Sequence, residues 1–78
     1  MIKKEMKLLI TFHTTLEAMM MENVCKEQQM DGRLIPVPGS ISAGCGLAWC
    51  ARLESEEMLT VLMKNHGIVP QQVLSCLI

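Results

Sequence analysis

Four short strand-like runs alternate with two segments of helical periodicity along the 78 residues of the chain. The runs are rich in Leu, Ile and Val and occupy residues 7–12, 33–37, 47–52 and 73–78. One helical segment follows the first run and the other follows the third, so the predicted element order is βαββαβ. This order predicts an α+β domain of ferredoxin-like class. We expect a four-stranded antiparallel sheet in the order 4-1-3-2, with both helices on one face.

Capping residues define the first predicted helix. Thr14 and Glu17 have the spacing of a capping box, in which each side chain satisfies a free backbone N–H at the helix start. The helix should end near Met30, before Asp31-Gly32. Its inward face is predicted from the apolar residues at helical spacing, which are Leu16, Met20 and Val24.

The second predicted helix begins near Ser55 and ends at Gly67. Its inward residues are predicted to be Leu59, Leu62, Met63 and His66. Pro36 lies within the second strand, and proline has no N–H to donate to a sheet ladder. The second strand should therefore be an edge strand, and the first and third strands should be central.

Composition limits the classes of function. The chain is short enough for a single domain over residues 1–78, and half of its residues are hydrophobic, which suffices for a core without cross-links. The net charge is −1, so a phosphate-binding nucleic-acid surface is not expected. The apolar stretch 8–10 is too short for a signal peptide or a membrane span. We therefore expect a cytoplasmic protein that contacts neither nucleic acid nor membrane.

The four cysteines are expected to be free thiols, because the cytoplasm is reducing. No two of them form a Cys-x-x-Cys motif, so neither a zinc site nor a dithiol redox site is predicted, and no cofactor is expected. Cys25, Cys50 and Cys76 fall in elements that should pack, and we interpret them as structural. Arg33 and Arg52 are expected at solvated strand positions.

Cys45 differs from the other three because it lies between Gly44 and Gly46, with Ser42 just before them. Bulky neighbours are missing, so its sulfur should be accessible, and the backbone N–H groups of this loop could favour the thiolate. The same position could instead hold a small residue that only fits a tight turn. Both interpretations remain open from the residues alone.

Two histidines are candidate auxiliary groups for this thiol. We expect the loop between the second and third strands at the end of the sheet where the first strand begins and both helices finish. On that placement, His66 lies nearer to Cys45, and His13 lies at the opposite end of the sheet.

Three segments carry a resemblance to a known family. They are LLITFHTT at 8–15, GRLIPVP at 32–38 and ISAGCGLA at 41–48, and they resemble a small family of bacterial selenium- and sulfur-carrier-like domains. The resemblance covers nearly the whole chain and implies a cysteine that carries sulfur or selenium, which maps onto Cys45. The chain differs from the pattern at Trp49-Cys50, where an aliphatic and then a basic residue would be expected.

Two functions follow as hypotheses. In the first, Cys45 carries a chalcogen as a persulfide or perselenide between a donor protein and an acceptor enzyme, as a covalent carrier and not a turnover enzyme. In the second, the domain is a non-catalytic protein-interaction module, and the Cys45 loop contributes only shape.

Overall fold

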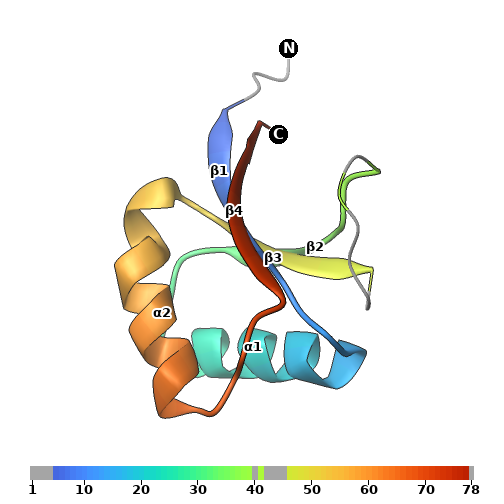
Figure 1. Cartoon of the computed structure of the whole chain (residues 1–78). Coiled ribbons are helices and arrows are strands. Elements are labelled where there is room, and N and C mark those ends of the chain that lie inside the picture. The colour runs from blue at the N-terminus through green and yellow to red at the C-terminus, as the bar shows by residue number, and fades with distance from the viewer. Residues whose placement is uncertain (1–4, 40, 42–45, 78) are drawn as a thin grey trace.

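The computed structural model describes residues 5–39, 41 and 46–77 and contains four strands and two helices (Figure 1). The strands are β1 (Met6–Thr11), β2 (Arg33–Pro36), β3 (Leu47–Ala51) and β4 (Gln72–Leu77). The helices are α1 (Thr15–Glu27) and α2 (Glu56–Asn65), and a short 3-10 turn, η1 (Leu53–Ser55), precedes α2.

The strands form one antiparallel sheet in the order β2-β3-β1-β4, which read from the other edge has the same neighbours as 4-1-3-2. The two central strands are therefore β1 and β3, as predicted. Pro36 lies in β2 at an edge, where its missing N–H removes no bond from the interior of the sheet.

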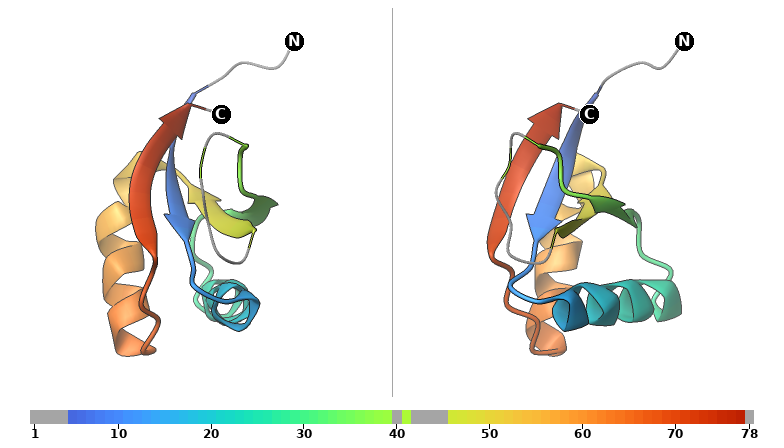
Figure 2. Two further views of the ribbon diagram at one scale, coloured as in Figure 1. Left: turned by 45° about the vertical axis from the view of Figure 1, so that its right-hand side comes forward. Right: turned by 90° about the vertical axis from the view of Figure 1, so that its right-hand side faces the viewer.

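The main core lies between one face of the sheet and the two helices (Figure 2). Because alternate residues of a strand point to the same face, Leu8 and Ile10 of β1 face the helices together with Trp49 and Ala51 of β3. The remaining buried members are Phe12, Ala18, Met21, Cys25, Leu59, Leu62, Met63 and Ile68. One hydrophobic layer thus joins both helices to the same side of the sheet.

Helix α1 begins at its predicted capping box. The backbone N–H of Glu17 donates to Thr14 Oγ1 at 3.2 Å, and that hydroxyl donates to the Glu17 carboxylate at 3.3 Å. The predicted inward face is wrong, because Leu16 is 68% exposed and the buried residues are Ala18, Met21 and Cys25. The helix also ends earlier than predicted, at Glu27.

Helix α2 buries Leu59, Leu62 and Met63, as predicted. The prediction that His66 points inward is wrong, because His66 is exposed and follows the last helical residue as its C-cap. Gly67 comes next with φ +69°, a left-handed conformation that glycine adopts at a helix end without strain.

The face of the sheet away from the helices, which we call the open face, has buried residues of its own. Leu9, Thr11 and Ala48 are 0% exposed although they alternate with the residues that face the helices. Cys50, Leu74 and Cys76 lie on this open face, because they pair in register with Leu9 and Lys7, and all three are partly buried.

Candidate functional site

Only part of the predicted Cys45 site lies within the described residues. Cys45, Ser42 and Gly44 lie outside them, whereas Gly46, the next residue in the sequence, is described. Gly46 has φ +74°, and its carbonyl accepts a hydrogen bond from the Val37 N–H at 3.0 Å. A Cβ added at Gly46 would meet no atom within 4 Å. Gly46 therefore needs glycine for its backbone conformation, and the space beside it is open.

The predicted placement of His13 is wrong. The last pair of the β1–β3 ladder is Thr11 with Ala48, and β2 ends with Pro36 paired to Leu47. The loop between β2 and β3 therefore leaves the sheet where β1 ends, because β1 and β2 run in the same direction on either side of β3. His13 follows Thr11 by two residues and so lies at this end of the sheet, not at the opposite one.

Both histidines are exposed, and they occupy different elements. His13 lies between β1 and the Thr14 cap of α1, whereas His66 ends α2 and donates its backbone N–H to the carbonyls of Leu62 and Met63. Helix α1 starts, and α2 ends, at the end of the sheet where β1 finishes, so both histidines lie toward that end. An auxiliary role for either histidine stays a prediction.

Two thiols lie on the open face of the sheet. Cys50 pairs with Leu9 of β1 and Arg33 of β2, and Cys76 pairs with Lys7 of β1. Strand β1 separates the two cysteines, and their partners on β1, Leu9 and Lys7, are two residues apart, so their Cα atoms are separated by more than two strand spacings, which is roughly 9–10 Å. That separation exceeds the reach of a disulfide, about 7 Å, and both thiols are free.

A cavity of about 280 Å³ opens beside Cys50. It is lined by Lys7, Asp31, Gly32, Arg33, Cys50, Ala51 and Arg52. Desolvation raises the pKa of the Cys50 thiol, the positive charges of Lys7 and Arg33 lower it, and the charges of Asp31 and Cys76 raise it further. The balance is a raised pKa, so Cys50 is mainly a neutral thiol at neutral pH, next to two cations.

Asp31 connects the turn after α1 to the end of β3. Its carboxylate accepts from the Arg52 backbone N–H at 2.8 Å and from the Ser55 hydroxyl at 3.2 Å, and it lies 3.3 Å from the Arg52 guanidinium. Its backbone carbonyl accepts from the Trp49 indole N–H at 3.1 Å. The Arg52 backbone N–H is the main reason that the pKa of Asp31 is lowered. We interpret Asp31 as a structural link.

Cys25 has the structural role predicted for it. It is 1% exposed in the core under α1, and burial raises the pKa of its thiol to about 11. A neutral, covered thiol is a poor nucleophile. Cys50 and Cys76 were predicted to be structural too, but they are only half-buried and face away from the main core.

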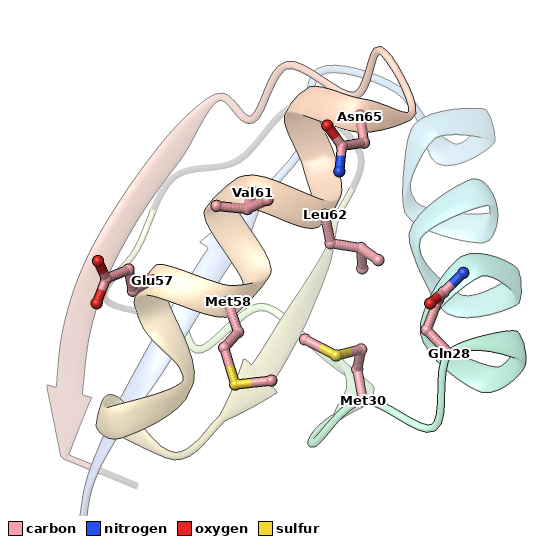
Figure 3. Close-up of a pocket in the computed structure, with 7 residues that line it drawn as sticks. All are labelled: Gln28, Met30, Glu57, Met58, Val61, Leu62 and Asn65. Carbon is pink, nitrogen blue, oxygen red and sulfur yellow. The ribbon is translucent and has the colours of Figure 1, made fainter.

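A groove of about 390 Å³ lies between the C-terminal end of α1 and the exposed side of α2 (Figure 3). Met30 and Met58 extend toward one another across it, and Leu62 lies at its floor. Met58 is 62% exposed and Val61 is 53% exposed, so α2 presents apolar side chains to solvent. This groove is a candidate surface for a protein partner.

Residues 5–39, 41 and 46–77 contain no group of three His, Cys, Asp or Glu side chains that could hold a metal ion. Within the same part of the chain, neither helix is long and apolar enough to cross a membrane.

The sequence matches a family model described as "Putative Se/S carrier protein-like" over residues 7–75. The chain belongs to this family. The match includes both helices, the whole of β2 and β3 and most of β1 and β4, so it covers the core and most of the sheet. A search of curated proteins found no match, and a search of solved structures found none either.

The cavity at Cys50 was missed in the sequence, although a signal for it exists. Strand alternation places Lys7, Leu9 and Thr11 on one face, and the ladder pairs that face with Cys50 and Arg33. The cavity depends on the register between neighbouring strands, and the pattern of residues within a single strand does not specify that register.

Proposed function

We propose that this member of the Se/S carrier-like family carries sulfur or selenium on Cys45, between a donor protein and an acceptor enzyme. The single observation that carries the proposal is the family match over residues 7–75. Support comes from Gly46, whose surroundings are open and whose left-handed backbone suits a glycine next to the candidate thiol.

The transfer is a thiol exchange. The Cys45 thiolate attacks the outer sulfur of a donor persulfide, a bond forms between the two sulfurs, and the donor's S–S bond breaks. The electron pair of the broken bond leaves with the donor thiolate, and Cys45 keeps the persulfide. A perselenide forms in the same way. The protein is a covalent carrier and turns over no substrate alone.

The proposal also includes the cellular compartment and the fold group of the protein. We place the protein in the cytoplasm, supported by three free thiols among the described residues, at Cys25, Cys50 and Cys76. We also group the fold with the ferredoxin-like domains, on the order of its elements and the neighbours in its sheet.

Intact-mass spectrometry tests the carrier function. The protein is incubated with cysteine and a cysteine desulfurase, and in parallel with selenocysteine, and its mass is then measured without reductant. We expect a gain of one sulfur or one selenium atom in the wild type and in Cys50→Ser, and no gain in Cys45→Ser. An adduct that persists in Cys45→Ser contradicts the assignment of Cys45.

A second candidate function is a non-catalytic interaction module. The observation that favours it is the groove at Met58 and Val61, which leaves apolar side chains exposed on α2. A protein that gains no adduct on any cysteine but binds partners through this groove would support the second function over the first.

A further inference from the structure

The open face of the sheet contains a second place where a thiol and positive charges come together. Cys50 lines a cavity of about 280 Å³ together with Lys7 and Arg33. This site lies on β1, β2 and β3, and its residues are separate from the Cys45 loop. It does not depend on the proposed carrier function.

The register explains why these side chains meet. Arg33 lies directly opposite Cys50 on the neighbouring edge strand β2. Leu9 lies opposite Cys50 on the other side, and Lys7, two residues before Leu9, is therefore its diagonal neighbour on the same face. Diagonal positions are about 7–8 Å apart, within reach of a long lysine side chain.

The charges around Cys50 leave the cavity positive. Arg52 is already engaged, because it lies 3.3 Å from Asp31 and 3.7 Å from Glu54. Lys7 lies 3.4 Å from Glu5, a solvent-exposed pair that contributes little energy. Arg33 is exposed and forms no ion pair within the described ranges. An anion in the cavity would thus meet a cation that no carboxylate neutralises.

We propose that Cys50, Lys7 and Arg33 form a thiol site for a small anionic disulfide. The cations hold the negative group of the ligand and bring its S–S bond to the Cys50 sulfur. The cavity is near the lower end of sizes for small-molecule sites, so it suits one half of a low-molecular-weight disulfide.

The reaction is a single exchange step. Cys50 first loses its proton to solvent, and the thiolate then attacks the nearer sulfur of the disulfide. A bond forms between Cys50 Sγ and that sulfur, the S–S bond of the ligand breaks, and its electron pair leaves with the other half as a thiolate. Cys50 is oxidised to a mixed disulfide, and the ligand is reduced by the same two electrons.

Two disulfide reagents of opposite character test the proposal. Dithiobis(2-nitrobenzoate) carries a carboxylate on each half, whereas 4,4′-dithiodipyridine is neutral at neutral pH. The readout is the ratio of their rates at Cys50 at low salt. A change in the thiolate fraction affects both reagents equally and cancels in this ratio, so the ratio reports recognition of the anion.

The labelled cysteine is identified by tryptic peptide mapping in full-length Cys45→Ser protein. Trypsin cuts after Arg33 and Arg52, so Cys50 is then the single cysteine of its peptide. Lys7→Gln and Arg33→Gln remove one cation each, Arg33→Lys keeps the charge, and Lys64→Gln on α2 is a control for net charge.

We expect the ratio of anionic to neutral rates to fall about threefold in Lys7→Gln and in Arg33→Gln, and further in the double variant. Arg33→Lys and Lys64→Gln should keep the wild-type ratio, and added salt should lower the wild-type ratio toward that of the double variant. A double variant with the wild-type ratio would overturn the proposal. So would a Cys50 that reacts no faster than the buried Cys25.

Discussion

The two faces of the sheet differ in whether their thiol is covered by apolar side chains or lies next to charged ones. The face toward the helices buries Leu8, Ile10, Trp49 and Ala51 in one apolar layer, and the thiol in that layer, Cys25 of α1, is covered and neutral. The open face buries Leu9 but also leaves a thiol beside charged groups at Cys50. A small domain can thus use one face of its sheet for stability and leave reactive groups accessible on the other.

The largest expected effect concerns packing next to Trp49, on the side of the helices. Gly32 has φ +118°, and a Cβ there would collide with the Trp49 indole ring and the Cys50 carbonyl. We expect Gly32→Ala to lower the free energy of unfolding by about 3 kcal/mol or more, because it combines backbone strain with overpacking. Urea unfolding measures the loss.

Gly46→Ala is the matched control for that substitution. Gly46 also has a positive φ, +74°, but a Cβ there meets nothing within 4 Å. Its cost should be about 1–2 kcal/mol, from the left-handed backbone alone. Equal losses of unfolding free energy in the two variants would show that the contacts with Trp49 contribute nothing. The distinction between the tightly packed Gly32 and the open Gly46 would then be wrong.

The next effect concerns the Asp31 link. We expect Asp31→Asn to lower the free energy of unfolding at pH 7 by about 1–3 kcal/mol, because the carboxylate accepts charge-assisted bonds from Arg52 and Ser55. Thermal unfolding at pH 7 and at pH 3 measures the change.

The pH dependence follows from the lowered pKa of Asp31 in the folded protein. Its contribution is complete above the unfolded-state pKa of about 3.9 and is lost as the pH falls through the lower folded-state value. The difference between wild type and Asp31→Asn should therefore shrink on acidification. A difference that stays constant down to pH 2 would contradict the role of the carboxylate charge.

The smallest effect concerns a hydroxyl on the open face. Thr11 is 0% exposed, and its Oγ1 has no hydrogen-bond partner among the described residues. We expect Thr11→Val to raise the free energy of unfolding by up to about 1 kcal/mol, because it removes an unsatisfied buried polar group at nearly constant volume.

Thr60→Val is the control for that gain. The Thr60 hydroxyl is exposed and donates to the Glu56 carbonyl at 2.8 Å, so its replacement should not stabilise the protein. A loss of stability in Thr11→Val would mean that the Thr11 hydroxyl forms a hydrogen bond in solution. The open face would then have no unsatisfied buried hydroxyl at this position.

The sequence predicted the sheet better than the helix faces. Short apolar runs, the capping box at Thr14 and the position of Pro36 within a strand suffice to predict four strands, two helices and the edge position of β2. The inward face of α1 was wrong because Met19, Met20 and Met21 are consecutive and equally apolar. The packed stripe also uses Ala18, which hydrophobicity alone would not select.

The candidate site was predicted less well, for a geometric reason. The end of the sheet at which a loop lies depends on the direction of every strand before it, so one misplaced direction put the loop between β2 and β3 at the end of the sheet opposite to His13. The thiol at Cys50 was assigned to packing because its neighbours across the ladder, Leu9 and Arg33, are distant in sequence.

Timed alkylation of the native protein tests the division between structural and reactive thiols most directly. Iodoacetamide is added at neutral pH, and each cysteine is followed by peptide mapping, with chymotrypsin cutting after Leu47 and Trp49 to separate Cys45 from Cys50. The account predicts that Cys45 is modified first, that Cys50 and Cys76 follow, and that Cys25 is modified only as fast as the protein unfolds. Modification of Cys25 before Cys50 would contradict it.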